Sequence, residues 1–233
     1  MIHTHFFIFN AFQQRCSLVW DDKGECAIID PGFYDSQERD QLFDHIENKG
    51  LHPVCIMLTH AHFDHISGMV ETAEKFDIPI YMSREEKVIL EEANVELCRS
   101  FGFRIPQGCG KGNGDVCRYI YIKESDIIKV GELDFEVIST PGHTPGGVCF
   151  LERKEKILFS GDTLFAGAIG RTDNRWGDYD ALIHGILTKL MVLDGSIDVI
   201  PGHGPTTTIA REGMTNPFLL PFNEPYQDEY SVE

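Results

Sequence analysis

Three histidines and one aspartate crowd into six consecutive positions, 60–65, which read HAHFDH directly after an apolar run. Alternation along an extended chain would place His60 and His62 on one side, and the turn into a following helix would bring Asp64 and His65 round beside them. Buried together, these side chains would cost much free energy of desolvation unless a cation compensated for it. The spacing therefore predicts a site for a metal ion.

Three further segments each end an apolar, strand-like run with one side chain of the same kinds. His143 lies in the turn STPGHTPGG, Asp162 ends the run LFSGD, and His203 lies in the turn PGHGP. With the first cluster they make five histidines and two aspartates at four turns. Imidazole and carboxylate ligands suit Zn²⁺, Fe²⁺ or Mn²⁺. Seven ligands exceed the needs of one tetrahedral ion and fit two ions, with a carboxylate available as a bridge.

The sequence between these turns predicts the elements that must position them. Short apolar runs of strand length alternate with helical patterns, an order that favours two sheets packed together with helices outside, a layered α/β arrangement. The predicted helices cover residues 36–49, 66–76 and 178–191. The predicted strands cover 6–9, 16–20, 25–29, 54–58, 78–82, 119–122, 126–130, 133–138, 147–152, 156–160 and 197–200.

The region between residues 83 and 118 has a different character. Ser83 with Glu86 three residues later is a capping-box pattern for the start of a helix. Residues 99–118 hold six glycines or prolines and two cysteines, and we predict a long loop or flap there. Cys109 and Cys117 match no strong zinc spacing, so we interpret them as loop thiols rather than a disulfide or a metal site.

The composition limits the classes of partner that the protein is expected to bind and the cellular compartment in which it is expected to work. The 233 residues include 20 lysines and arginines against 37 aspartates and glutamates, a net charge of −17, which disfavours nucleic acid and anionic membranes as partners. No apolar run approaches the ~20 residues of a membrane span. Without a secretory leader pattern, and with seven scattered cysteines that suit reduced thiols, a cytoplasmic protein is expected. We predict one domain over residues 1–220, followed by an acidic extension over 221–233.

The ordered set of turns resembles the metallo-β-lactamase superfamily, and three segments narrow the resemblance to its glyoxalase II-like branch. These segments read TPGHTPG at 140–146, GDTLF at 161–165 and GRTD at 170–173. The resemblance implies a four-layer αββα sandwich with a metal site at the edge of its two sheets. It also implies a single-domain, metal-dependent hydrolase similar to hydroxyacylglutathione hydrolases, with two divalent ions, Zn²⁺ ahead of Fe or Mn.

The resemblance also implies roles for individual residues. It implies that one ion binds to three histidines, His60, His62 and His143. A second ion would bind to an aspartate and two histidines, Asp64, His65 and His203. Asp162 would bridge the two ions, and Asp30, in the segment IDPG, would orient a ligand without touching a metal. Arg171 matches a basic residue that contacts the substrate's carboxylate, and the alternative is a salt bridge to Asp173 or Asp178.

The chemistry expected of such a site is hydrolysis. Two cations that share a bridging water would lower its pKa from 15.7 to roughly 7 or below, so that hydroxide is available at neutral pH to attack a carbonyl. We expect Asp64 and Asp162 to be the catalytic carboxylates. A small thioester is the expected substrate, because its thiolate leaves without strong protonation. The oligomeric state stays open.

Other functions remain as alternatives. Persulfide dioxygenases of the same superfamily share the histidine cluster and the GRTD segment, and the resemblance implies that they use one iron on His60, His143 and Asp162. One iron with oxygen uptake would favour that enzyme, whereas two zinc ions with anaerobic thioester turnover would favour the hydrolase. A catalytically idle metal-binding or partner-binding module is disfavoured by the complete ligand set, and β-lactam hydrolysis by the lack of a secretory signal.

Overall fold

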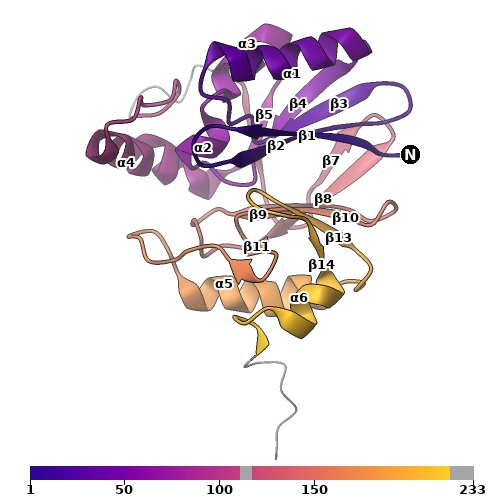
Figure 1. The fold of residues 1–233 in the computed structure, drawn as a ribbon, viewed down its shortest axis with the longest axis vertical. Coiled ribbons are helices and arrows are strands. Elements are labelled where there is room, and N and C mark those ends of the chain that lie inside the picture. Colours follow the sequence, from indigo (N-terminus) through magenta and orange to yellow (C-terminus); the bar gives the residue numbers. More distant parts are fainter. Residues whose placement is uncertain (111–116, 221–233) are drawn as a thin grey trace, which may run out of the picture.

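Two six-stranded sheets lie face to face at the centre of the structure, a computed structural model that describes residues 1–110 and 117–220 (Figure 1). The first sheet follows the order of the chain: β1 (His3–Phe9), β2 (Gln14–Trp20), β3 (Glu25–Ile29), β4 (His52–Met57), β5 (Ile80–Ser83) and β6 (Tyr119–Ile122). Strands β1 to β3 pair antiparallel, and β3 to β6 pair parallel. The parallel strands therefore end at one edge of the sheet.

The second sheet has the order β14-β13-β10-β9-β8-β7. Its strands are β7 (Ile127–Val130), β8 (Leu133–Ser139), β9 (Val148–Glu152), β10 (Ile157–Gly161), β13 (Asp198–Pro201) and β14 (Thr207–Thr208). Only β10 and β13 pair parallel within this sheet, so these two strands end side by side. A small hairpin, β11 (Leu164–Phe165) and β12 (Ala168–Ile169), follows β10.

Helices cover the outer face of each sheet (Figure 1). Helices α1 (Ser36–Lys49) and α3 (Met69–Phe76) lie on the first sheet, and α5 (Tyr179–Gly185) and α6 (Ile209–Thr215) lie on the second. Three apolar cores correspond to the three spaces between these four layers. The predicted layered α/β arrangement is confirmed, and so is the αββα sandwich.

The strand sequences explain these layers, because successive side chains of a strand point to opposite faces of its sheet. On β3, Cys26 and Ile28 belong to the core under the first helices, whereas Ala27 and Ile29 belong to the core between the sheets. A strand buried on both faces needs apolar residues at every position, which is why these runs show no polar alternation.

Helix α1 has the predicted bounds, and its ends show why. The Asp35 side chain accepts a hydrogen bond from the Glu38 N–H at 2.9 Å and so satisfies one of the unpaired donors of the first turn. At the other end Gly50 adopts the left-handed conformation, with φ of 63°, and its N–H returns to the last turn.

The other two predicted helices are wrong in part. Instead of one helix over 66–76, a short α2 (Phe63–Ile66) is followed by α3 after a break at Gly68. A side chain at position 68 would overlap the ring of Phe33, and glycine is in any case a poor helix former. The helix predicted over 178–191 is α5 as far as Gly185 and then continues as a π-helix, η3 (Ile186–Leu190).

The region between β5 and β6 also differs from its prediction. It contains a 3₁₀ turn η1 (Arg84–Glu86), a π-helix η2 (Ile89–Ala93) and α4 (Asn94–Phe101), so the first three residues of the predicted loop 99–118 are helical. Residues 102–110 form turns and irregular chain. The remaining predicted loop residues 111–116 and the predicted extension 221–233 lie outside the described residues.

The capping box predicted from Ser83 and Glu86 is wrong. No side chain caps η1, and the Ser83 hydroxyl instead donates to the Glu85 carboxylate at 2.5 Å. Glu86 is buried and faces the candidate site described below.

The cysteines are all among the described residues, and none of them forms a disulfide. Cys109 and Cys117 are therefore not paired with each other, as predicted. Within the described ranges no helix is long and apolar enough to cross a membrane.

Candidate metal centre

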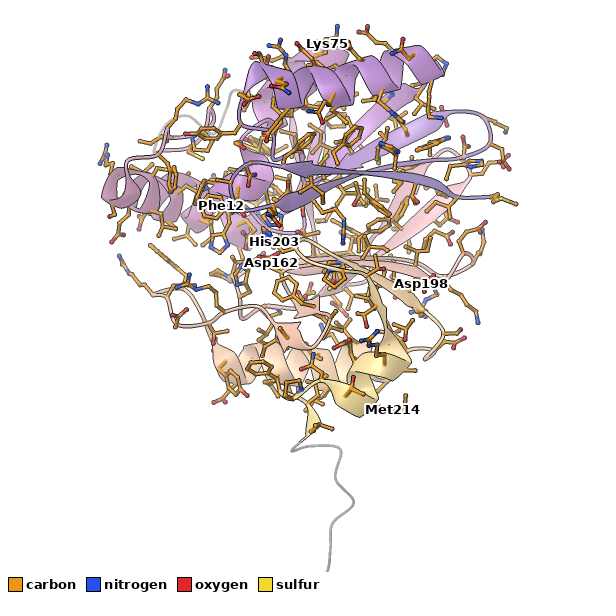
Figure 2. All side chains as sticks on the ribbon, viewed as in Figure 1. Phe12, Lys75, Asp162, Asp198, His203 and Met214 are labelled. Atoms are coloured by element: carbon orange, nitrogen blue, oxygen red, sulfur yellow. The ribbon has the colours of Figure 1, made fainter. Side chains whose placement is uncertain are left out.

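All seven candidate ligands lie where strands of the two sheets end. Four of them follow β4, His143 follows β8, Asp162 follows β10, and His203 follows β13. Figure 2 shows Asp162 and His203 together at the junction of the two halves of the molecule. The structure therefore brings together side chains that are as far apart in sequence as His60 and His203.

The first group of side chains consists of His60, His62 and His143. One ring nitrogen from each lies within 4.8 Å of those of the other two. The closest approach joins His62 Nδ1 to His143 Nε2 at 2.9 Å. This is the trio that the resemblance implies for one ion.

The second group consists of Asp64, His65 and His203, whose candidate ligand atoms also lie within 4.8 Å of one another. His65 Nε2 is 3.1 Å from His203 Nε2, and His203 Nε2 is 3.3 Å from Asp64 Oδ2. This is the trio that the resemblance implies for the other ion.

Asp162 lies between the two groups. Its Oδ2 is 3.6 Å from His143 Nε2 of the first group and 3.6 Å from His203 Nε2 of the second. Its Oδ1 is 3.4 Å from His65 Nε2. The carboxylate thus has the position that a bridging ligand requires, although the ligand roles themselves remain predictions.

Acceptors behind the imidazoles fix the direction in which four of them point. His65 Nδ1 lies 2.9 Å from an Asp30 carboxylate oxygen, and His60 Nδ1 lies 3.1 Å from the Thr59 hydroxyl, which itself donates to Asp30 at 2.6 Å. The Nδ1 atoms of His143 and His203 lie 2.8 and 3.0 Å from backbone carbonyl oxygens of residues 171 and 12. An Nδ1–H held in this way leaves the Nε2 lone pair directed at the centre, as a metal ligand needs.

Asp30 therefore has the position expected of an orienting residue. It contacts His65 directly and His60 through Thr59, and it also accepts the Thr59 N–H at 2.8 Å. The carboxylate is buried, and the backbone of Asp30 has a positive φ of 51°. An aspartate tolerates this conformation better than most residues do.

The residues present fit a divalent cation. Among the described residues, His60 Nε2 is buried without a hydrogen-bond partner, which is costly for a polar atom unless something else satisfies it. Burial lowers the pKa of His62 to about 3 and holds the pKa of His60 well below its usual value, so both imidazoles are neutral. Neutral imidazoles are the form that binds metal.

The charges in the second group are arranged differently. Burial alone would lower the pKa of His65, but the carboxylates of Asp162 and Asp64 hold it well above its usual value. Burial likewise opposes ionisation of Asp162, yet the neighbouring His65 keeps the pKa of that carboxyl well below its usual range. A positive charge is thus already favoured at this point, and a cation would take the place of the proton.

Gly202, in the segment PGHG, lets the chain pass close to this centre. A Cβ at this position would lie 2.5 Å from Asp162 Oδ1 and 2.6 Å from His65 Cε1. Any other residue would push these two side chains away from their present positions.

Glu86 and Asn94 support the site, and sequence reasoning did not identify them. Glu86 Oε2 accepts the Ala61 N–H at 2.7 Å, and Oε1 accepts the Gly146 N–H at 2.8 Å. The Asn94 side-chain amide donates to the Ala61 carbonyl oxygen at 2.7 Å. Both polar groups of the residue between His60 and His62 are therefore held by buried side chains.

Glu86 also joins two turns that carry candidate ligands. Ala61 lies in the HAHFDH segment, and Gly146 lies in the turn of His143. Burial raises the pKa of Glu86 to about 7, against the hydrogen bonds from Ala61 and Gly146 that favour the carboxylate. The only signal in the sequence was a glutamate at the end of an apolar strand, and the capping pattern offered a more local explanation for it.

We expect replacement of Glu86 by glutamine to weaken zinc binding by about 10- to 100-fold. The amide would offer one acceptor oxygen to two backbone N–H groups and would turn its NH₂ toward the other. The measurement is competition for zinc against a chelator of known affinity. Glu85→Gln, at an exposed neighbouring position, should keep the original affinity, and equal affinities for both variants would contradict this role for Glu86.

The side chain of Arg171 does not point into the metal centre. Its guanidinium pairs with the Asp173 carboxylate at 2.8 and 3.2 Å, which is one of the two salt bridges expected as the alternative. Both side chains are largely exposed, at 75% and 70%. Its backbone carbonyl oxygen holds His143, as described above. A role for its charge in substrate binding remains a prediction.

Comparisons with known proteins agree with this geometry. The family model described as the metallo-beta-lactamase superfamily matches residues 9–203. A protein of Haemophilus influenzae named hydroxyacylglutathione hydrolase GloC is 40% identical over 213 residues, which cover 90% of this chain and 94% of that protein.

Two solved structures are similar over nearly the whole chain. One is that of BLEG-1 B3 metallo-beta-lactamase, with 35% identity and a TM-score of 0.81, covering 94% of this chain and 99% of that chain. The other is that of TTHA1623 in a di-iron-bound form, with 33% identity and a TM-score of 0.79, covering 92% of this chain and 100% of that chain.

Proposed function

Because this chain belongs to the metallo-beta-lactamase superfamily, we propose that it is a dinuclear metal-dependent hydrolase that cleaves small thioesters, as a hydroxyacylglutathione hydrolase does. The observation that carries the proposal is the position of the Asp162 carboxylate between the two ligand groups. Its carboxylate lies within 3.6 Å of one histidine from each ligand group, so a single side chain can serve two ions.

Each ligand group would bind one of the two ions. The first group, His60, His62 and His143, would hold one ion, and the second group, Asp64, His65 and His203, would hold the other. When bound, such ions supply hydroxide at neutral pH by lowering the pKa of a water molecule to about 7. Zinc suits this donor set, and the di-iron-bound form of TTHA1623 makes iron the first alternative.

We assign the catalytic roles to the carboxylates of Asp64 and Asp162. Each is mostly buried yet carries a lowered pKa, so each is ionised in a site with little water to screen its charge. They can orient a nucleophilic water toward a carbonyl carbon by accepting its hydrogen bonds. Fixed polar groups of this kind stabilise a transition state because they need no rearrangement during the reaction.

A thioester suits the site because nothing in the second group is a strong proton donor to a leaving group once the ligands are occupied. A thiolate leaves without strong protonation, whereas an alkoxide does not. The name of the Haemophilus influenzae relative supports a hydroxyacyl thioester of glutathione as the first substrate to test.

The deciding experiment combines elemental analysis of the purified protein with an anaerobic hydrolysis assay. The panel should hold thioesters of glutathione, coenzyme A and smaller thiols, together with a β-lactam, since BLEG-1 is named a β-lactamase. Two metal ions per chain with thioester turnover would support the proposal. Full metal content without turnover of any thioester would contradict it.

The second candidate is an iron-dependent persulfide dioxygenase. This enzyme would hold one ion on His60, His143 and Asp162, and the observation in its favour is that Asp162 Oδ2 lies 3.6 Å from His143 Nε2. One iron per chain, oxygen uptake and no anaerobic thioester hydrolysis would favour this enzyme over the hydrolase.

We further propose that the guanidinium of Arg171 binds a substrate carboxylate after leaving Asp173. Replacement of Arg171 by alanine should then raise KM about tenfold for thioesters that carry a carboxylate, because a charge-assisted hydrogen bond is lost. It should leave kcat nearly unchanged, since binding is lost equally in the ground and transition states. The control is Arg153→Ala, which removes an exposed arginine paired with Glu136 beyond the far end of β9. An unchanged KM for Arg171→Ala would contradict the role.

The remaining proposals concern context. We place the protein in the cytoplasm, since its seven cysteines form no disulfides although several are buried among apolar side chains. Its excess of acidic residues is the reason to propose a small-molecule substrate rather than nucleic acid or a membrane surface. We also retain residues 1–220 as one domain.

A further inference from the structure

A pocket lined by aromatic rings opens beside the second ligand group. We call it the aromatic pocket, and the residues that define it are Asn10, Ala11, Phe12, Tyr34, Phe63, Asp64 and Phe103. Its unoccupied space of about 280 Å³ includes open solvent, so the pocket is an open hollow against which a ring or a branched alkyl group can lie.

Three phenylalanines from separate parts of the chain form its wall. Phe12 meets Phe63 edge-on, with ring centres 5.2 Å apart, and meets Phe103 at 5.5 Å. Phe63 and Phe103 stack at 5.5 Å. Despite these ring contacts, Phe12 is 42% exposed to solvent. Together the rings make an apolar surface at the mouth of a polar site, and such surfaces mark places where ligands bind.

The polar groups around the aromatic pocket are already engaged with the protein. The Asn10 side-chain amide donates to the carbonyl oxygens of Gly32 and Asp64, both at 2.9 Å. The Tyr34 hydroxyl accepts the Arg104 N–H at 2.8 Å, and the Arg104 guanidinium lies over the Tyr34 ring. What the pocket offers a ligand is therefore mainly ring faces.

The residues that define the aromatic pocket include no lysine or arginine. Its one acidic residue, Asp64, belongs to the second ligand group. The pocket therefore offers no cationic side chain to a substrate carboxylate, and an uncharged apolar group matches its ring faces.

The loop that carries Phe12 links the aromatic pocket to the metal centre. It also holds His203, because the Phe12 carbonyl oxygen lies 3.0 Å from His203 Nδ1. Figure 2 shows Phe12 near His203 and Asp162. A substrate carbonyl at the centre thus has one substituent within reach of the rings.

From these observations we propose that the aromatic pocket binds an uncharged apolar group attached to the scissile carbonyl, on either its acyl or its thiol side, and so selects apolar thioesters. The proposal rests on the hydrolase function proposed above. It adds a substrate class and names Phe12, Phe63 and Phe103 as the residues that determine specificity.

The test compares two series of thioesters on the metal-loaded protein. One series varies the acyl group on N-acetylcysteamine from acetyl to butanoyl to benzoyl, and the other varies the thiol of an acetyl ester from ethanethiol to phenylmethanethiol to glutathione. The quantity compared is kcat/KM for each ester divided by that of acetyl-N-acetylcysteamine. In one series the apolar member should exceed the reference by at least about tenfold, the usual size of a selective apolar contact.

Replacement of Phe103 by alanine should lower that ratio by about tenfold, because it removes one ring of the wall. Comparing ratios between variants cancels the intrinsic reactivity of each ester. Phe12→Ala is the second variant, since a side chain as exposed as Phe12 can be truncated with little effect on folding. The matched control is Phe218→Ala, which removes a similarly exposed ring, at 41%, after α6.

The outcomes separate this proposal from the function on which it rests. Ratios that stay the same in Phe103→Ala and Phe12→Ala, while the reference ester is hydrolysed, would overturn the aromatic pocket and leave the hydrolase intact. Absence of a preference for the apolar member in both series would overturn it as well. Failure to hydrolyse any ester in either series would overturn the hydrolase itself.

Discussion

Replacement of Asp162 by alanine should lower kcat for thioester hydrolysis by at least ~10²-fold. The Asp162 carboxylate contacts histidines of both ligand groups. Without its negative charge, two cations would face each other across a buried site with less to offset their repulsion. The variant should therefore also bind less than the full complement of metal, which elemental analysis of the dialysed protein would measure.

The control for this variant is Asp198→Ala. Asp198 is exposed and lies at the opposite end of β13 from His203, well away from Asp162 in Figure 2. It should retain both metal and activity. Because the contacts of the Asp162 side chain are with other ligand side chains, its loss should leave the circular dichroism spectrum unchanged. Activity of Asp162→Ala within a few-fold of the original would contradict both the bridging and the catalytic role.

Removal of metal by a chelator should abolish hydrolysis and also lower the melting temperature. At a free metal concentration one thousand times Kd, binding stabilises a native state by about 4 kcal/mol, which corresponds to roughly 10 °C for a chain of this size. The metal-free protein would retain its apolar cores but would leave atoms such as His60 Nε2 without a partner. Differential scanning calorimetry before and after treatment would measure the change.

Adding back one metal at a time distinguishes ions that restore only stability from the ion that also restores activity. Zinc, manganese and iron should each restore the melting temperature in proportion to their binding, and the metal that also restores hydrolysis is the competent one. Asp198→Ala should respond like the unchanged chain, whereas Asp162→Ala should regain less. A melting temperature and an activity that both survive complete removal of metal would show that the seven side chains form a purely structural cluster.

Much of the fold follows from local sequence patterns. Strands buried on both faces are marked by uninterrupted apolar runs, as in β3, and α1 carries a capping aspartate and a terminal glycine at the predicted positions. Strand β3 and helix α1 have the predicted bounds, whereas β1 begins three residues before its predicted start. The break at Gly68 was not predicted, because the ring that requires a glycine at this position belongs to Phe33, 35 residues earlier in the chain.

The candidate site was predictable for a similar reason. Histidine and aspartate in turns after strands are conspicuous, since those residue types at those places have few structural explanations. The supporting residues were not predictable in this way. Glu86 has a local explanation as a helix cap, and only the fold reveals that it accepts N–H groups from Ala61 and Gly146. The carbonyl oxygen of Phe12 carries no side-chain signal at all.

The division of each ligand group between the two sheets has a consequence for biosynthesis. Each group takes two members from residues 60–65 and its third from the second half, His143 or His203. On the proposed function, a ribosome that has made only the first sheet has completed neither ligand group. His203 is synthesised late, so a growing chain would bind the proposed pair of ions and hydrolyse a substrate only after its two halves had packed together.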